Sequence, residues 1–108
     1  MRYAVNGSSE VNQQISKSVE YIANELHNPQ AAESHYAELD KALAMLEENP
    51  LIRPKVREPY LAALGVRSIM VKKYYLFYTV DEDNQTVQLI SFMHSRMDWQ
   101  GRLADMIE

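Results

Sequence analysis

The chain has 108 residues, a net charge of −4 at neutral pH and no cysteine. This length corresponds to one domain spanning residues 1–108, and the lack of cysteine excludes disulfides and thiolate metal sites. Because no stretch is apolar enough to cross a bilayer or to form a signal peptide, we expect a cytoplasmic protein without a membrane partner.

A short strand and an amphipathic helix are predicted at the start of the chain. Residues 2–5 fit a strand, and the Asn-Gly-Ser-Ser sequence at residues 6–9 breaks it and offers helix caps. From residue 10 to about residue 26, apolar side chains recur every three or four positions and so share one side of a helix. They are Val11, Ile15, Val19, Ile22 and Leu26.

A second helix is predicted directly afterwards, to about residue 48. Asn28 can cap this helix, and Pro29 suits its first position. We expect His35 at the surface and Met45 opposite the apolar face. That face consists of Ala32, Tyr36, Leu39, Leu43 and Leu46. Because the link between the helices is short, they should form an antiparallel hairpin.

Residues 51–65 form the irregular part of the chain, interrupted by prolines and with one possible helical turn at residues 60–64. Residues 53–73 hold six basic residues and one acid, a net of +5, whereas the rest holds five basic and fourteen acidic residues, a net of −9. Such a basic segment can meet a polyanion locally, or it is simply a solvated loop and turn. The overall acidity argues against non-specific nucleic-acid binding. The cations that an extended loop would point the same way are Arg53, Lys55 and Arg57.

Three consecutive strands are predicted in the second half, because three stretches are rich in β-branched and aromatic residues. They lie at residues 66–71, 74–80 and 86–93. Lys72-Lys73 and the polar residues 81–85 supply the turns of an antiparallel meander.

The middle predicted strand is apolar on both faces. Tyr74 and Leu76 point to one face, and Tyr75 and Phe77 point to the other. A helical hairpin covers only one face of a small sheet. The other face therefore needs the C-terminal helix or a partner protein as cover, or it forms the floor of a partly open groove.

The chain ends in a polar stretch, His-Ser-Arg-Met-Asp-Trp at residues 94–99, followed by a short helix that Asp98 can cap. The sequence thus predicts an α+β domain. Its N-terminal strand and αα-hairpin pack on a small, mainly antiparallel sheet with a short C-terminal helix. No group of His, Asp or Glu residues has metal-ligand spacing, so neither a metal nor a cofactor is expected.

The order and spacing of these elements resemble the RelE/ParE toxin superfamily of bacterial type II toxin–antitoxin systems. VEYIANEL resembles the family's first helix, ALAMLEENP the end of its second, and residues 66–99 its meander with a terminal His-x-Arg-x-Asp-aromatic signature. The resemblance implies a toxin that takes part in plasmid stabilization and is wrapped by a cognate antitoxin. It also implies two possible mechanisms, namely cleavage of mRNA in the ribosomal A site or inhibition of DNA gyrase.

Metal-independent RNA cleavage needs a base, an acid and cations beside the phosphate. Imidazole is a suitable acid or base near neutral pH, guanidinium and ammonium groups suit phosphate, and aromatic rings can stack bases. The candidate catalytic residues are His94, Arg96 and Arg67, and the candidate RNA-binding residues are Lys55, Arg57, Tyr75 and Trp99.

Each candidate also has a structural interpretation. His94 can make a hydrogen bond at the strand end, Trp99 can pack in the core, and Arg67 can pair with an acidic helix face. Arg96 and Asp98 can pair with each other, or Asp98 can cap the last helix.

Two positions depart from the nuclease members of the superfamily. Tyr75 stands where their Tyr-Arg-apolar-apolar-Tyr motif has arginine, and Met97 replaces the second arginine of His-x-Arg-Arg-Asp. Each change removes a cation that would stabilise a phosphate transition state. We favour a ribosome-dependent mRNA endonuclease because His94, Arg96 and the loop cations supply the parts. The alternatives are a gyrase inhibitor, which needs only a surface, and a non-toxic member that binds only antitoxin.

Overall fold

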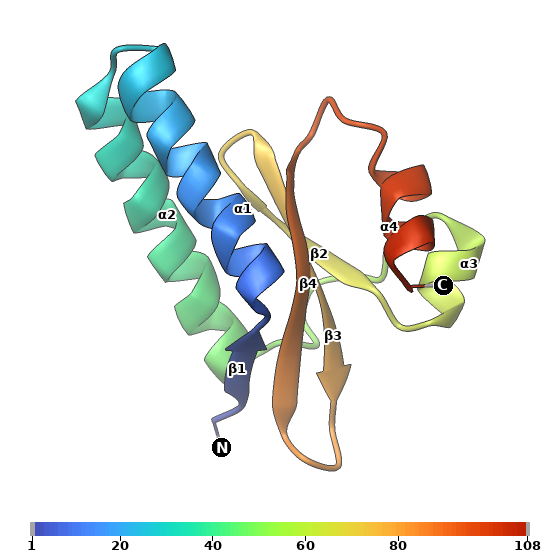
Figure 1. Cartoon of the computed structure of the whole chain (residues 1–108). Coiled ribbons are helices and arrows are strands. Elements are labelled where there is room, and N and C mark those ends of the chain that lie inside the picture. Colours follow the sequence, from blue (N-terminus) through green and yellow to red (C-terminus); the bar gives the residue numbers. More distant parts are fainter. Residues whose placement is uncertain (1, 108) are drawn as a thin grey trace.

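The computed structural model describes residues 2–107 and contains one four-stranded sheet (Figure 1). β2 (Arg67–Val71), β3 (Tyr74–Asp81) and β4 (Thr86–His94) form the predicted antiparallel meander. β1 (Ala4–Gly7) pairs in parallel with β4, which gives the strand order β1-β4-β3-β2. This pairing extends β1 through an Asn-Gly pair where the sequence predicts a break, because hydrogen bonds to β4 outweigh the weak strand preference of those residues.

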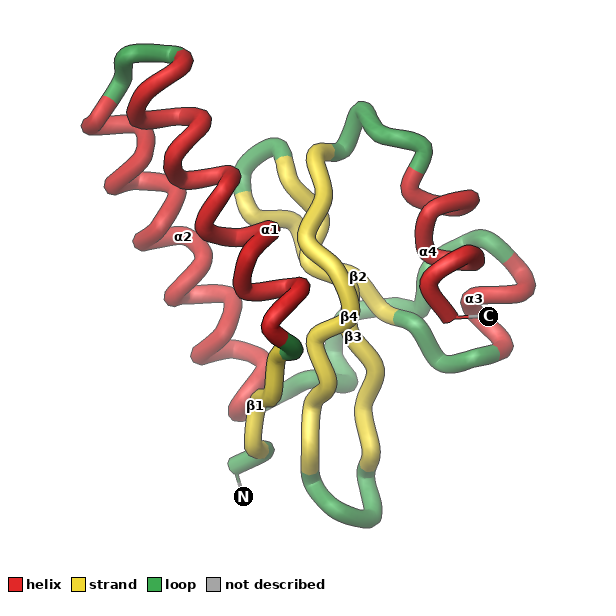
Figure 2. The backbone as a smooth tube through the Cα atoms, in the orientation of Figure 1, coloured by secondary structure: helices red, strands yellow, loops and turns green. Residues whose placement is uncertain are grey.

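Two long helices form the predicted hairpin on one face of the sheet (Figure 2). α1 (Ser9–Glu20) is capped by Ser8, and α2 (Pro29–Glu48) by Asn28. Each cap accepts a hydrogen bond from the backbone N–H three residues later, at 3.2 and 3.0 Å, which satisfies a group that the helix leaves free. Between the helices lies η1 (Tyr21–Glu25), a π-helical turn in place of the predicted last α-helical turns.

The main core lies between the hairpin and the sheet. Its buried members come from α1, α2 and all three strands of the meander. They include Val11, Leu39, Leu46, Ile69, Val71, Leu76, Tyr78, Val87, Leu89 and Phe92. Burial of such side chains, at about 1.5–3 kcal/mol each, holds the hairpin on the sheet.

The buried stripe of α2 is rotated relative to the prediction. Tyr36 is 53% exposed, and Leu26, which lies before α2 at the end of η1, is 56% exposed, although both were expected to face the core. His35, expected at the surface, is only 1% exposed, and Met45 packs against the core instead of lying opposite it. The predictions were wrong because packing on the sheet sets the rotation of α2 about its own axis, which helical periodicity alone does not fix. The residues buried on α2 are Ala32, His35, Leu39, Ala42 and Leu46.

The second face of the sheet is covered by the chain itself. α3 (Pro59–Ala63) and α4 (Trp99–Ile107) lie on the side opposite the hairpin (Figure 1). Cover by the C-terminal helix, one of the alternatives for this face, is therefore present. The second core contains Val56, Leu61, Val66, Phe77, Met93 and Leu103, with Tyr75, Ile90 and Trp99 packed against it.

A side chain of α1 completes the edge of β4. β1 ends opposite Leu89, and the register between β3 and β4 then shifts where β4 carries one extra residue, Ile90. Beyond this point the Gln14 side-chain oxygen accepts hydrogen bonds from the Phe92 N–H, at 2.8 Å, and from the Ser91 hydroxyl, at 3.2 Å. A helix side chain therefore takes the place of a neighbouring strand.

None of the helices in the described part of the chain is long and apolar enough to cross a membrane. The longest, α2, carries charged side chains along its exposed side. Its apolar stripe is instead matched to one face of the sheet, as in a helix that packs on a globular core.

Candidate functional site

The sheet separates the predicted site residues into two groups. Along β3, Tyr74 and Tyr78 belong to the core under the helical hairpin, whereas Tyr75 belongs to the core under α3 and α4. His94 is the β4 partner of Tyr74, and Arg67 is the β2 partner of Tyr78. Paired residues share a face of the sheet, so His94 and Arg67 lie on the face opposite Tyr75.

The four candidate RNA-binding residues line one cavity of about 630 Å³ on the α4 side, which we call the basic hollow. Its floor is aromatic. The ring of Trp99 lies 5.1 Å from that of Phe77 and 6.1 Å from that of Tyr75, measured between centroids. The structure therefore brings together Lys55, Arg57, Tyr75 and Trp99. The packing interpretation of Trp99 also holds, since its ring contacts the second core.

The loop before β2 presents the two cations of the basic hollow. Val56 is buried, and its N–H donates to the Val66 carbonyl at 2.9 Å, which fixes this segment against the start of β2. Its neighbours Lys55 and Arg57 are consequently exposed. Arg53 does not line the hollow. The chain turns before it, and its guanidinium contacts the Met45 sulfur at 3.7 Å.

The basic hollow has little capacity for proton transfer. Its described lining residues include no histidine and one carboxylate, which belongs to Glu58. That carboxylate caps α3 by accepting a hydrogen bond from the Leu61 N–H at 2.8 Å. The hollow therefore offers positive charge and aromatic surface but not the imidazole that the sequence predicts as the acid or base.

Arg67 anchors the irregular loop. Its guanidinium donates to the carbonyl oxygens of Leu51, at 3.4 Å, and Arg53, and no acidic helix residue pairs with it in the described structure. Its strand partner Tyr78 and the partner of His94 are four residues apart on β3, or about 13 Å along the strand. The structure therefore does not bring Arg67 and His94 together.

His94 holds the turn that follows β4. Its Nδ1 accepts a hydrogen bond from the Arg96 N–H at 3.1 Å, and its ring lies 5.2 Å from that of Tyr74. Since Nδ1 accepts, the neutral ring carries its proton on Nε2. The hydrogen bond at the strand end, one of the two interpretations of His94, is present. Arg96 is exposed, and Asp98 caps α4 through the Gly101 N–H at 3.4 Å.

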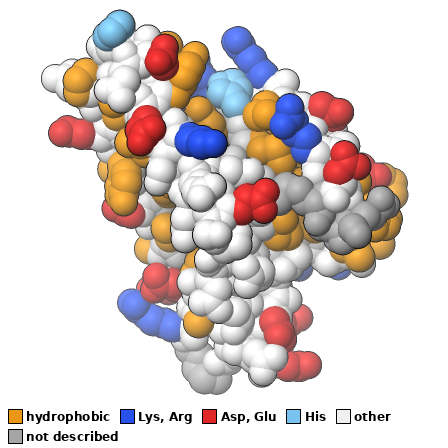
Figure 3. Space-filling model, in the orientation of Figure 1, with side chains coloured by type: hydrophobic (Ala, Val, Ile, Leu, Met, Phe, Trp, Pro, Cys, Tyr) orange, Lys and Arg blue, Asp and Glu red, His pale blue; other side chains and the backbone are white. Residues whose placement is uncertain are grey.

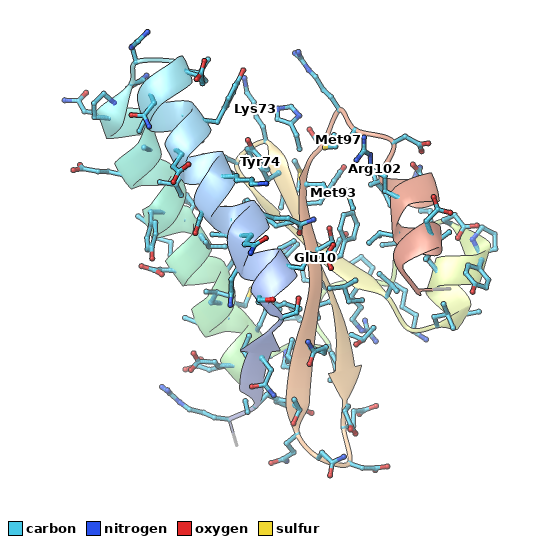
Figure 4. The ribbon with its side chains drawn as sticks, viewed as in Figure 1. Glu10, Lys73, Tyr74, Met93, Met97 and Arg102 are labelled. Carbon is cyan, nitrogen blue, oxygen red and sulfur yellow. The ribbon has the colours of Figure 1, made fainter. Side chains whose placement is uncertain are left out.

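A second pair of cavities lies along α1, one across the edge of β4 and one under the hairpin tip. One, of about 520 Å³, runs between α1 and α4 and is the α1–α4 cleft; Figure 4 shows Glu10, Met93, Met97 and Arg102 around it. The other, of about 460 Å³, lies between the hairpin tip and the β2–β3 turn and is the Lys72–Lys73 cavity. Figure 3 shows basic side chains beside an apolar patch in the upper part of this face.

Sequence reasoning missed this second region. It placed the two lysines in a turn and in the basic segment of residues 53–73, without a cavity beside them, and it expected His35 at the surface. Two apolar residues near the hairpin tip, Tyr21 and Leu26, are 51% and 56% exposed, and the sequence carries no signal for this because helical periodicity places Leu26 on the buried side. Large exposed apolar side chains around a concave surface are typical of binding sites.

His35 is the buried polar group of this region. Its Nε2 lies 3.0 Å from the Ser18 hydroxyl oxygen, and that hydroxyl donates to the Ile15 carbonyl at 2.6 Å. The Ser18 oxygen must therefore accept the Nε2 proton, and Nδ1 is left as a buried acceptor with no donor among the described atoms. Burial, and to a smaller extent the charge of Lys72, lower the pKa of His35. The ring is therefore neutral near pH 7.

The described residues contain no group of three or more His, Cys, Asp or Glu side chains placed to hold a metal ion. The arrangements on the two faces are therefore a basic, aromatic hollow and an apolar groove with a basic end. Both are suited to recognising a surface of another molecule, the first by charge and stacking and the second by burial of side chains.

Comparison with solved structures gives several similar folds. The Mycobacterium tuberculosis toxin–antitoxin complex RelBE2 has a chain with a TM-score of 0.61 and 20% identity, covering 87% of this chain and 99% of that one. A chain of the chromosomal ParDE system of Pseudomonas aeruginosa has a TM-score of 0.65 at 10% identity, covering 85% and 95%. A free Escherichia coli RelE toxin with two arginines replaced by alanine has a TM-score of 0.63 at 19% identity, covering 98% and 94%.

Sequence comparison identifies the family. No curated protein matches the chain. Residues 6–99 match the family model described as the ParE toxin of the type II toxin–antitoxin system, parDE. The match covers nearly the whole described fold, from β1 to the first residue of α4. This chain therefore belongs to the ParE toxin family of type II toxin–antitoxin systems.

Proposed function

We propose that this chain is a toxin that inhibits DNA gyrase, as the ParE-like members of the superfamily do. The observation that carries this proposal is the separation of His94 from the basic hollow by the sheet. An inhibitor that acts by binding needs no acid–base pair, and the substitution of the nuclease arginine by Tyr75 is then no obstacle. The match to the ParE family model supports the same mechanism.

The basic hollow is the surface that we assign to the target. Lys55 and Arg57 are exposed at its rim, and Trp99 is half-buried in its floor. Aromatic and arginine side chains often supply most of the energy of a protein interface. Exposed cations at the rim would direct the toxin to an acidic patch and mainly raise the rate of association.

A ribosome-dependent mRNA endonuclease is the second candidate. One observation favours it, namely the gathering in one cavity of the four residues expected to contact RNA. The ribosome could supply part of the positioning that a sparse site lacks. Under this mechanism Lys55 and Arg57 would stabilise the phosphate, and Tyr75 or Trp99 would stack a base.

Pulse labelling in bacteria distinguishes the candidates. After induction of the toxin, thymidine and amino-acid incorporation are followed side by side for several minutes. A gyrase inhibitor stops thymidine incorporation first, and the purified protein blocks supercoiling of relaxed plasmid by gyrase. Early arrest of amino-acid incorporation, with mRNA cut at the ribosomal A site, would replace the gyrase assignment by the nuclease one. Undiminished growth would contradict both and leave a member that only binds antitoxin.

A further inference from the structure

The loop that carries the cations of the basic hollow begins on the other side of the sheet. It leads from the end of α2 to α3 and passes the outer edge of β2 (Figure 1). The side chains of residues 51–55 are all exposed, so burial of apolar surface does not hold this part of the loop in place. Its position therefore depends on hydrogen bonds to its backbone.

Two side chains on the hairpin face of the sheet supply these hydrogen bonds. Tyr78 is fully buried, and its hydroxyl donates to the Pro50 carbonyl at 2.7 Å. Its strand partner Arg67 donates from the guanidinium to the carbonyl oxygens of Leu51, at 3.4 Å, and of Arg53. Two neighbouring side chains, which we call the loop clamp, thus bind the carbonyls at three of the four positions 50–53.

Both donors of the loop clamp are present near neutral pH. The guanidinium of Arg67 is always charged, and its planar fork of N–H groups can reach two carbonyls at once. Burial raises the pKa of Tyr78, although the charges of Arg67 and Arg53 lower it in part. The phenol therefore keeps the proton that it donates to the loop.

The loop clamp ends two residues before Lys55. The Arg53 carbonyl is bound by the clamp, and the Val56 N–H is bound by the Val66 carbonyl at 2.9 Å. Only Pro54 and Lys55 lie between these two fixed points, and the ring of proline restricts the backbone further. The direction of the Lys55 side chain is therefore set from both ends.

The loop clamp does not touch the basic hollow. The described lining of the hollow includes neither Arg67 nor Tyr78, whose side chains lie on the opposite face of the sheet. Arg57 depends less on the clamp, because the buried Val56 separates it from the bound carbonyls. An effect of the clamp on the hollow must therefore pass through the loop, and mainly through Lys55.

We propose that Arg67 and Tyr78 are positioning residues of the basic hollow, which act from the opposite face of the sheet by fixing the direction in which Lys55 enters it. The inference rests on the proposed function, in which the hollow binds the target. It gives Arg67 a role other than the phosphate contact expected from the sequence. A loop that is ordered in advance loses less entropy when the target binds, so the clamp raises affinity without contacting the target.

Three substitutions separate this role from charge and from general stability. Arg67→Lys keeps the positive charge but not the planar fork. Tyr78→Phe removes one hydroxyl and leaves the ring in the core. Tyr74→Phe is the matched control, because it removes a hydroxyl from the same face of the same strand that has no hydrogen-bond partner among the described residues.

The first readout is the fluorescence of Trp99, the only tryptophan of the chain, which lies half-buried in the floor of the hollow. Iodide is an anion and is concentrated by nearby cations, whereas acrylamide is neutral. The ratio of iodide to acrylamide quenching, at constant ionic strength, therefore reports the cations beside the ring. We expect Lys55→Ala to lower this ratio roughly 1.5- to 2-fold, both clamp variants to lower it at least half as much, and Tyr74→Phe to leave it unchanged.

The second readout is the toxin concentration that halves supercoiling by gyrase. Arg67→Lys should raise this concentration roughly three- to tenfold, since the loop must then be ordered during binding. In a Lys55→Ala background the same substitution should cost less than about twofold, whereas in an Arg57→Ala background it should keep its full effect. A residue that only stabilises the fold would not distinguish these two backgrounds.

The two readouts can fail separately. A wild-type protein that does not inhibit gyrase contradicts the proposed function, and the quenching ratio then decides the role of the clamp by itself. Unchanged quenching ratios in both clamp variants would overturn the inference, as would an equal change in Tyr74→Phe. A loss of inhibition in Arg67→Lys that persists in full in the Lys55→Ala background would also overturn it.

Discussion

The two faces of the sheet differ in how far the chain itself covers their side chains. On the α4 side, the aromatic floor of the basic hollow is packed by its own chain, with Phe77 1% exposed and Trp99 against it. On the hairpin side, Tyr21 and Leu26 are left exposed and His35 keeps an unpaired acceptor. A surface whose side chains are packed by their own chain can bind a target without rearrangement. A surface with exposed apolar groups is stabilised by a molecule that covers it.

Among the substitutions that alter one face of the sheet, removal of an aromatic ring from the floor of the basic hollow should have the largest effect. Phe77→Ala should destabilise the fold by about 3–5 kcal/mol, because it leaves a cavity in the second core. Urea unfolding followed by circular dichroism measures this. A loss below about 1 kcal/mol would mean that α3 and α4 repack and that the hollow is not rigid.

Removal of the cations tests the hollow without disturbing its floor. K55A/R57A should reduce gyrase inhibition, and toxicity in cells, at least about tenfold, since exposed rim charges steer the encounter. Both side chains are exposed, so unfolding should change by no more than about 0.5 kcal/mol. Antitoxin binding is the internal control and should stay intact. Full toxicity of this variant would move the target surface to another part of the molecule.

Acidification should weaken the hairpin side selectively. The pKa of His35 is lowered by burial and by Lys72, so below about pH 6.5 the unfolded chain binds a proton that the folded chain resists. Stability should therefore fall as the pH falls from 7 to 5. Urea midpoints across this range, compared with those of His35→Gln, isolate the effect. The hydrogen bonds from Asn84 lower the pKa of Asp81, so that carboxyl titrates below this window.

The smallest effect is expected at His94. His94→Ala removes the hydrogen bond to the Arg96 N–H and should cost about 1 kcal/mol of stability. Toxicity should survive, because the proposed mechanism needs no proton transfer. Growth inhibition at matched expression levels is the measurement. A loss of 100-fold or more in a folded variant is the effect expected of a general acid or base, and would favour mRNA cleavage.

Much of the fold could be predicted because it is encoded locally. The alternation of Tyr74 to Tyr78 marks a strand with two apolar faces, and the caps Ser8 and Asn28 mark where helices begin. The membership of the basic hollow could also be predicted, since Lys55 and Arg57 alternate around a buried Val56.

The second region could not be predicted because it is assembled from distant segments. The Lys72–Lys73 cavity joins residues 21–35 to residues 72–74 and to His94, and nothing in a single sequence fixes those contacts. His35 and Tyr36 are neighbours on α2, and the small rotation that decides which of them is buried comes from packing on the sheet.

The amide of Gln14 has a consequence for the behaviour of this protein at high concentration. A strand edge with free N–H and C=O groups is a template on which further chains can add, and this is a common route to aggregation. Beyond β1, the Gln14 side-chain oxygen accepts from one backbone group of the β4 edge, the Phe92 N–H, and also from the Ser91 hydroxyl. Each of these hydrogen bonds contributes only about 1 kcal/mol to stability. Loss of the Gln14 side chain would therefore leave the Phe92 N–H free on the part of the β4 edge that β1 does not cover.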